Sequence, residues 1–348
     1  MAQTEQALLA DLDQDLADYP ALRERRIDTV FFGGGTPSLF PPAAIGDILA
    51  GAHARLAFAD DAEITLEANP GTTERGRFAG YRQAGVNRIS LGVQSFDDAM
   101  LHRLGRIHGR AEALEAAAEV QAAGIGELNL DLMYALPQQT LDGAIADIEQ
   151  AIALAPTHLS HYQLTLEPHT EFAVRPPPLP DDDLAFAMME TCQQRLSAAG
   201  YRHYETSAYA LPGHACRHNL NYWRFGDYLG IGAGAHGKFR VDGGIRRRWR
   251  HKHPRLWLQH AGTAAAIGGD DAVGSVDLPF EFALNALRLH EGFTLPQFTA
   301  TTGLDPASLD APLARAAQLE LIERDGPRIR ASEHGRRFLN DLQALFLP

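Results

Sequence analysis

The feature that most constrains the fold of this 348-residue chain is an alternation of short apolar runs with longer amphipathic segments over its first two thirds. The apolar runs are rich in β-branched residues and are bounded by turn residues, which is typical of buried strands. They lie at 28–32, 63–67, 87–93, 127–133 and 159–166. The helical patterns lie at 41–56, 73–84, 111–123, 140–154 and 182–199. Five successive βα units predict a parallel sheet with helical crossovers, either doubly wound or part of a barrel.

Three later stretches do not continue this alternation. The Pro-rich stretch 175–183 predicts a loop before the last helix of the first domain. Residues 201–238 are dense in Gly, His, Asn and aromatic residues and have no clean period. From about residue 278, helical patterns and a short β element around 322–329 predict a small winged-helix-like α+β domain. The expected domains are therefore 1–200, 201–270 and 271–348.

Composition and charge narrow the functional classes. With 45% hydrophobic and 22% charged residues, the chain has the composition of a globular protein. The net charge of −13 disfavours binding to nucleic acid or anionic membranes, because phosphate contacts need a basic face. No window reaches the ~18 apolar residues of a membrane span, and the acidic first residues do not resemble a signal peptide. Because Cys192 and Cys216 are the only cysteines, we expect no disulfide framework and a cytoplasmic location.

Residues suited to ligand binding follow the predicted strands. The segment 33–37, GGGTP, joins a strand to a helix, and successive glycines let the backbone approach a ligand closely. A tight βα turn is the structural alternative, although such a turn seldom needs three glycines. Glu67 ends the second strand, where a carboxylate can accept hydrogen bonds from an ammonium or a hydroxyl group. A solvated loop acid explains Glu67 alone equally well.

Gln94, Arg106 and Asp131 lie at or beyond the ends of later strands. An amide suits hydroxyl groups, and a guanidinium suits a carboxylate. Asp131 interrupts an otherwise apolar strand, and an unpaired buried carboxylate is costly, so we expect it to have a function. An aspartate that caps a neighbouring helix is the alternative. In barrel enzymes the carboxyl ends of the strands carry the ligand site, so these side chains are expected to converge there.

Five motifs, in this order and spacing, resemble the core of a radical S-adenosylmethionine (SAM) family. They are GGGTP, EANPG, NRISLGVQSF, LGRIH and NLDLMYALPQQT. The family includes oxygen-independent coproporphyrinogen III dehydrogenases and HemW-type heme chaperones. The resemblance implies a partial (β/α)6 barrel, with SAM across the strand ends, and a C-terminal domain. It implies contacts to the methionine part of SAM from Gly34, Gly35, Thr36 and Glu67. It implies contacts to the adenosyl part, the carboxylate or a second ligand from Gln94, Arg106, Asp131 and Thr165.

The sequence departs from this family at its start. In the family, a strand ending in a Cys-x3-Cys-x2-Cys loop precedes the segment matching 7–16, and its thiolates hold a 4Fe–4S cluster. This sequence opens inside the first helix of that pattern, and Cys192 and Cys216 match no cluster position. We therefore expect a barrel without its first strand, no reductive cleavage of SAM by the chain as written, and no assigned catalytic residue. Two explanations stay open: a start codon placed too late, which the intact SAM residues favour, or a natural relative without a cluster.

The segment 218–223, HNLNYW, is similar to the HNxxYW motif of the HemW-type chaperones. An imidazole such as that of His218 can ligate heme iron axially, and Tyr222 and Trp223 offer flat apolar surface to a porphyrin. The alternative is a histidine that is hydrogen-bonded at a domain junction. The resemblance implies a chaperone that binds heme and SAM and delivers heme to hemoproteins. Decarboxylation of coproporphyrinogen III, or a cluster-free module that binds SAM or a tetrapyrrole, are the competing functions.

Residues 246–252, RRRWRHK, form a basic island in this acidic chain. Guanidinium groups suit the propionates of a tetrapyrrole. A solvated loop or a weak anion site explains the same residues equally well, so the sequence alone leaves the role of this island open.

Overall fold

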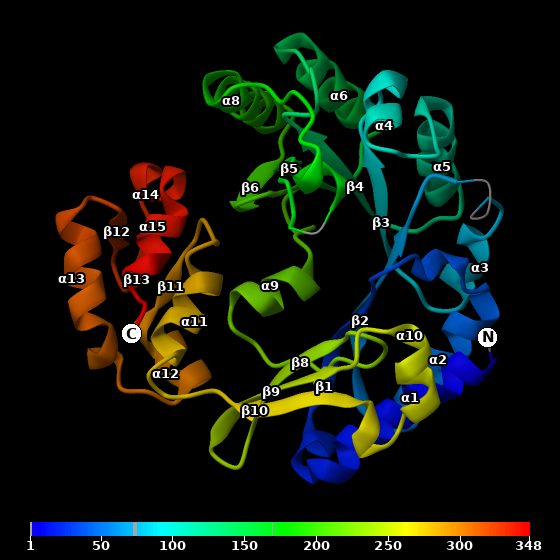
Figure 1. The fold of residues 1–348 in the computed structure, drawn as a ribbon, viewed down its shortest axis with the longest axis vertical. Helices are drawn as coiled ribbons and strands as arrows, with labels where there is room; N and C mark the ends of the chain where they lie inside the picture. Colours follow the sequence, from blue (N-terminus) through cyan, green and yellow to red (C-terminus); the bar gives the residue numbers. More distant parts are fainter. Residues whose placement is uncertain (1, 72–74, 169) are drawn as a thin grey trace. The chain divides into compact units, whose positions relative to one another are not determined.

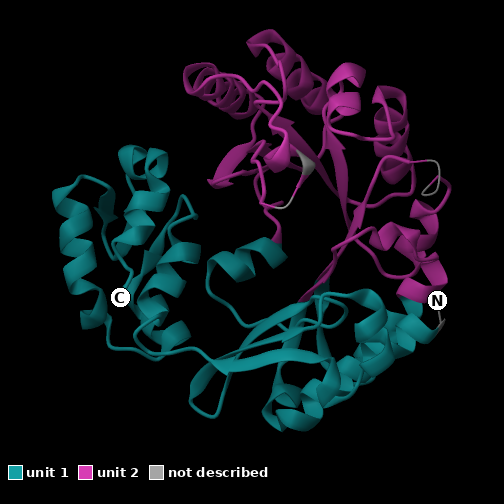
Figure 2. Ribbon diagram, in the orientation of Figure 1, with its two compact units in different colours: residues 1–28, 46–62, 217–348 teal, residues 29–45, 63–216 magenta. Residues whose placement is uncertain are grey.

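The structure, a computed structural model, describes residues 2–71, 75–168 and 170–348. The chain forms two compact units, which Figure 2 distinguishes by colour. Unit 1 comprises 1–28, 46–62 and 217–348, and unit 2 comprises 29–45 and 63–216. The domain boundaries expected after residues 200 and 270 stay predictions.

A seven-stranded sheet, most of it in unit 2, has the order β1-β2-β3-β4-β5-β7-β6 (Figure 1). The strands are β1 Arg26–Phe32, β2 Ala57–Ala68, β3 Arg88–Gln94, β4 Glu127–Tyr134, β5 His158–Gln163, β6 Arg202–Glu205 and β7 Ala208–Ala210. β2, β3, β4 and β5 pair in parallel in chain order. All five predicted strands are confirmed, and with their helices they form the expected partial barrel. β7 pairs antiparallel with β5, and β6 with β7, so two strands that the sequence did not predict extend the sheet.

Helices follow the strands of unit 2. They are α3 Phe78–Gln83, α4 Asp98–Arg103, α5 Arg110–Ala122, α6 Leu141–Ala153, α7 Glu171–Val174 and α8 Asp182–Ala198. In Figure 1, α4, α5, α6 and α8 lie along the outer side of these strands. Side chains cap three of these helices: Asp97, Thr140 and Asp181 accept hydrogen bonds from backbone N–H groups in the first turns of α4, α6 and α8, respectively. The Pro-rich stretch therefore leads into the capped start of α8, as predicted.

Unit 1 contains a second sheet, with the strand order β10-β9-β8. Its strands are β8 His236–Val241, β9 Gly244–Arg250 and β10 Ile267–Ala272. The other helices before residue 270 are α1 Ala2–Asp18, α2 Pro42–His53, α9 Arg217–Trp223 and α10 Pro254–His260.

The basic island forms most of β9, so the interpretation as a solvated loop is wrong. Arg248 Nη1 and Arg250 Nη2 each lie 2.7 Å from Asp15 Oδ1 of α1. Arg246 Nε lies 2.8 Å from Asp270 Oδ1 of β10. These guanidinium groups join β9 to its neighbours in unit 1, which gives the island a structural role.

The C-terminal part of unit 1 is the small α+β domain that the sequence predicts. Its elements are α11 Leu278–Ala286, β11 Phe293–Thr294, α12 Leu295–Thr302, α13 Asp310–Gln318, β12 Ile322–Asp325, β13 Arg328–Ala331, α14 Glu333–Arg337 and α15 Leu339–Ala344. The strands form a sheet in the order β11-β13-β12. The buried rings of Phe293 and Phe298 pack edge-on against Phe282, with centroids 5.0 and 5.1 Å away. An aromatic cluster therefore lies in the core of this domain.

Short 3-10 helices complete the structure at Pro20–Glu24, Pro37–Leu39, Ala264–Ala266 and Pro306–Leu309. Among the described residues, no helix combines the length and the apolar character that crossing a lipid bilayer requires.

Candidate functional site

A pocket in unit 2 is lined by residues at the ends of the parallel strands and in the segments after them. Parallel strands bring their carboxyl ends to one edge of the sheet, so residues far apart in the sequence meet there. Five of the predicted site residues line the pocket: Gly35, Glu67, Gln94, Arg106 and Asp131. The predicted convergence of these side chains is therefore observed.

The glycine turn after β1 holds Glu67. Gly34 and Gly35 have φ angles of 77° and 66°, in the left-handed region that favours glycine, and a Cβ atom at either position would meet open space. The N–H of Gly34 donates a hydrogen bond to Glu67 Oε2 at 3.1 Å. Burial raises the pKa of Glu67, and the bond from Gly34 opposes that rise. A cationic ligand group would stabilise the ionised form of this carboxyl.

Asp131 of β4 accepts hydrogen bonds from neighbouring neutral side chains. Ser90 Oγ donates to Asp131 Oδ2 at 2.9 Å, and Asn129 Nδ2 donates to Oδ1 at 2.8 Å. Burial raises the pKa of Asp131, and hydrogen bonds from Ser160, Asn129 and Ser90 oppose the rise. Asp131 therefore lines the pocket, and its role in ligand binding stays a prediction.

Gln94 ends β3 in a strained conformation. Its φ angle is 69°, which is uncommon for a residue with a side chain. Its Oε1 accepts a hydrogen bond from Tyr162 OH at 3.0 Å. The next two residues are fixed from α6, because Asp147 accepts hydrogen bonds from Ser95 Oγ and Phe96 N, both at 2.7 Å. Local strain of this kind is held by its surroundings and is often associated with ligand sites.

The pocket combines two half-buried acids, an amide and a guanidinium with a backbone turn that carries no side chain. Such a set suits a polar ligand that has both a cationic group and hydroxyl or carboxylate groups.

The HNxxYW segment forms α9 in unit 1. His218 and Tyr222 lie four residues apart, so they share one face of the helix, and their ring centroids are 5.0 Å apart. The Tyr222 ring also lies 4.3 Å from the ring of Tyr228. The guanidinium of Arg288 stacks over Trp223, with its carbon 4.3 Å from the ring centroid. α9 thus carries a histidine beside a row of aromatic rings.

Comparison with known proteins identifies the family. The pattern of the Radical SAM superfamily matches residues 7–151, and that of the HemN C-terminal domain matches residues 276–338. The heme chaperone HemW of Escherichia coli (strain K12) is 50% identical to this chain, over 98% of this chain and 89% of that protein. The chain belongs to the HemW family of radical SAM proteins.

More distant relatives extend the comparison. The mouse protein "Radical S-adenosyl methionine domain-containing protein 1, mitochondrial" is 36% identical, over 93% of this chain and 76% of its own length. A solved structure of coproporphyrinogen III oxidase (HemN) from Escherichia coli, described as a radical SAM enzyme, superposes with a TM-score of 0.80. It is 21% identical and covers 99% of this chain and 82% of that chain. At this identity the likeness shows the fold alone, the radical SAM barrel with a C-terminal domain.

The remaining predicted site residues lie in different places. Gly34 and Thr36 flank Gly35, and Gly34 contacts Glu67. Thr165 Oγ1 donates a hydrogen bond to Glu167 Oε1 at 2.9 Å, and Thr165 is not among the residues that line the pocket. Its contact with SAM stays a prediction.

Sequence reasoning missed several polar residues beside the pocket. Ser90 is two residues before Gly92, so both share one face of β3, and both line the pocket. Asn129 is two residues before Asp131 and shares its face of β4. The period of two would have found both, had it been applied to polar residues as well as apolar ones.

The two cysteines are buried in unit 2. Cys192 lies in α8, where its sulfur is 3.7 Å from the carbonyl oxygen of Ala144. Cys216 is the last residue of unit 2, immediately before α9. Within the described ranges, no group of three His, Cys, Asp or Glu side chains is arranged to hold a metal ion.

Proposed function

We propose that this chain is a heme chaperone that binds heme through α9, binds SAM in the pocket of unit 2, and delivers heme to hemoproteins. The observation that carries the proposal is the HNxxYW helix, with its histidine and tyrosine on one face. The 50% identity to a protein named as a heme chaperone supports it. A coproporphyrinogen III dehydrogenase ranks second, because the likeness to such an enzyme rests on the fold.

Heme is the cargo in this proposal. His218 would supply an imidazole nitrogen to the iron, and Tyr222 would offer an aromatic surface to the porphyrin. The adjacent Tyr228 ring extends that surface.

The pocket fits SAM by its donor set. The glycine turn at 34–35 leaves room where side chains would stand, so a ligand can approach the backbone. Glu67 would accept from the ammonium group of the methionine part, and Gln94 and Asp131 would bind the adenosyl part. Arg106 would pair with the ligand carboxylate.

The 4Fe–4S cluster of the family is not assigned to residues of this sequence. Cys192 and Cys216 are the two cysteines, they are separated along the chain, and both are buried away from the pocket lining. They do not fit a three-thiolate motif. The proposal therefore includes no step that passes through a cluster. It places the chain in the cytoplasm, since no disulfide framework is present among its two free cysteines.

Titration of the purified protein with hemin tests the proposal. We expect a Soret band to appear with the wild type and the affinity of His218→Ala for hemin to fall at least about tenfold, because the axial ligand is lost. His253→Ala is the matched control, since His253 is an exposed histidine of the same unit. Calorimetry with SAM tests the pocket independently. A Soret band that is absent in the wild type, or unchanged in His218→Ala, would contradict the heme assignment.

A further inference from the structure

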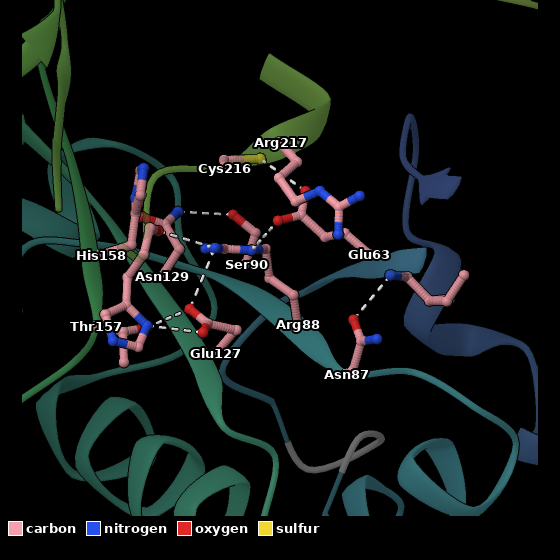
Figure 3. A network of polar contacts seen from close by, with 12 residues as sticks. Glu63, Asn87, Arg88, Ser90, Glu127, Asn129, Thr157, His158, Cys216 and Arg217 are labelled. Atoms are coloured by element: carbon pink, nitrogen blue, oxygen red, sulfur yellow. Dashed lines mark hydrogen bonds and ion pairs between the residues drawn. The ribbon is translucent and has the colours of Figure 1, made fainter. Parts of the chain in front are cut away.

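A buried polar network runs along one face of the sheet in unit 2, from the pocket to the segment before α9 (Figure 3). Its members alternate along β3 and β4, so their side chains share one face. In the register of the sheet, Arg88 pairs with Glu127, Ser90 with Asn129, and Asn129 with His158. Side chains of this face therefore form rows across three strands.

One branch of the network consists of neutral groups. His158 Nδ1 lies 2.6 Å from Asn129 Oδ1, and His158 Nε2 lies 2.8 Å from Tyr204 OH. The backbone N–H of Cys216 donates to Tyr204 OH at 3.4 Å. At the other end, Asn129 Nδ2 donates to the pocket acid Asp131 at 2.8 Å.

The donors of this branch all point toward Asp131. Asn129 uses its NH2 group toward Asp131, so its oxygen accepts from His158 Nδ1–H. The Nε2 of a neutral His158 then accepts from Tyr204 O–H, whose oxygen accepts from Cys216 N–H. Burial lowers the pKa of His158 to about 3, which keeps the ring neutral as this direction requires. Hydrogen bonds in such a chain polarise one another.

The second branch is charged and holds the same segment. Arg88 Nε lies 3.0 Å from Glu63 Oε2, and Arg88 Nη2 donates to the carbonyl of His214 at 2.9 Å. His214 Nδ1 lies 2.7 Å from Glu127 Oε1. The thiol of Cys216 lies 3.4 Å from Glu63 Oε1. Figure 3 shows Glu63 and Glu127 close to the guanidinium of Arg88.

The segment 214–216 is thus held by ring, carbonyl, backbone N–H and thiol contacts, although it lies outside the pocket lining. Arg88 and Glu63 are 2% and 6% exposed, and burying such charges carries a large desolvation cost that pairing only offsets. One attested use of buried polar groups is to specify a geometry. The next element along the chain is α9, with His218 two residues beyond Cys216.

We propose that Tyr204 is a positioning residue for the heme site, and that the hydrogen-bond chain from Asp131 through Tyr204 to Cys216 links ligand binding in the pocket to heme binding at α9. This inference rests on the proposed function. A ligand that covers the pocket removes water from Asp131, which strengthens the electrostatics of the bonds that end there. The row of hydrogen bonds then holds Cys216, and with it the start of α9, more firmly. By linkage, heme must affect the pocket ligand by the same factor.

The test is a hemin titration with and without saturating SAM. We expect SAM to tighten hemin binding about fivefold in the wild type, a typical size for such coupling. In Tyr204→Phe, which removes only the bridging hydroxyl, the ratio should fall to about one, with weaker hemin binding and a changed Soret band. Tyr201→Phe is the matched control, because its buried hydroxyl donates to the Pro156 carbonyl at 2.6 Å, outside the network. This variant should keep the wild-type ratio.

The outcomes separate the inference from the proposed function. If the wild type gives no Soret band, or calorimetry detects no SAM binding, the proposed function fails and the inference falls with it. If both ligands bind but SAM leaves the hemin affinity unchanged, the inference alone is overturned. The same holds if Tyr204→Phe keeps the full effect of SAM, or if Tyr201→Phe loses it equally. Thermal unfolding of both variants checks that each is folded at the temperature of the titration.

Discussion

Two buried networks of this chain place arginines among carboxylates. They differ in whether every carboxylate is paired with an arginine or one of them is bonded to neutral side chains alone. In unit 1, Arg250 of β9 is fully buried, and its Nη2 lies 2.7 Å from Asp15, which is itself buried. In unit 2, Arg88 pairs with Glu63 in a similar way. There, however, the network continues to Asp131, which receives hydrogen bonds from neutral side chains and forms no ion pair within the described part of the chain. The second network therefore reaches the pocket of unit 2.

The pKa shifts of two further acids show the same contrast between arginine partners and neutral partners. Burial tends to raise the pKa of Asp270 in unit 1, but Arg248 and other partners outweigh it and hold that pKa below its ordinary value. Asp147 in unit 2 accepts hydrogen bonds from neutral groups at 95–96, and burial raises its pKa to about 6. A carboxylate that already has an arginine gains little from a cationic ligand, whereas one with neutral donors gains more. The partner of a buried acid therefore distinguishes a structural charge from one available to a ligand.

The largest effect is expected from Arg250→Met. This change leaves Asp15 without one of its two guanidinium partners in a buried position, and breaking a buried pair typically costs about 3–5 kcal/mol. Denaturant unfolding measures the loss. Arg330→Met is the control, because its pair with Glu323 is exposed and should contribute less than about 1 kcal/mol. Equal losses in the two variants would show that the β9 network is not a structural core of unit 1.

A smaller effect is expected from the pH dependence of Asp147→Asn. A carboxyl whose pKa is raised on folding contributes stability below its unfolded pKa of about 4, and this contribution is lost as the pH rises through about 6. The free energy of unfolding of Asp147→Asn, relative to wild type, should therefore increase between pH 4 and pH 7, on the order of 2–3 kcal/mol. Chemical unfolding at several pH values measures it.

For Asp270→Asn, we expect the opposite pH dependence of the stability relative to wild type. Because its folded pKa is lowered, Asp270 contributes stability above its unfolded pKa, and the contribution is lost as the pH falls through the folded value. The relative stability of Asp270→Asn should therefore rise toward low pH. If both variants shifted in the same direction, the distinction between neutral and arginine partners would fail.

The fold of unit 2 could be predicted from its sequence because its buried strands are apolar and its helices are amphipathic. β3 and β4 carry buried leucine, isoleucine and valine between polar positions of the inner face. The burial of β9 could not be predicted in the same way. Its sequence, GIRRRWR, places arginines at buried positions, and their stability there depends on aspartates of α1 and β10 that lie far away in the chain. No local period records such partners.

The pocket was predictable in outline, because strand ends in a parallel sheet converge whatever their spacing in sequence. The residues of the hydrogen-bond network behind the pocket could not be predicted. Tyr204 lies in β6, and Cys216 lies in the loop after β7. β6 and β7 are short strands that pair antiparallel at the edge of the sheet. Thr165 shows that family resemblance also has limits. The resemblance implies a contact with the ligand, whereas in the structure its hydroxyl donates to Glu167.

The smallest effect, and the most specific, is expected from Asp131→Asn. The amide keeps an oxygen that can accept from Ser90 or Asn129, so the sheet should stay intact, but an NH2 donor replaces the second carboxylate oxygen, which would accept from a hydroxyl group of the adenosyl part. SAM affinity measured by calorimetry should fall about tenfold, which corresponds to about 1.4 kcal/mol. At neutral pH the variant should unfold no more easily than wild type, because burial disfavours the charged form of Asp131. A variant that loses stability while keeping its SAM affinity would make Asp131 a structural acid like Asp15, and the contrast between the two networks would disappear.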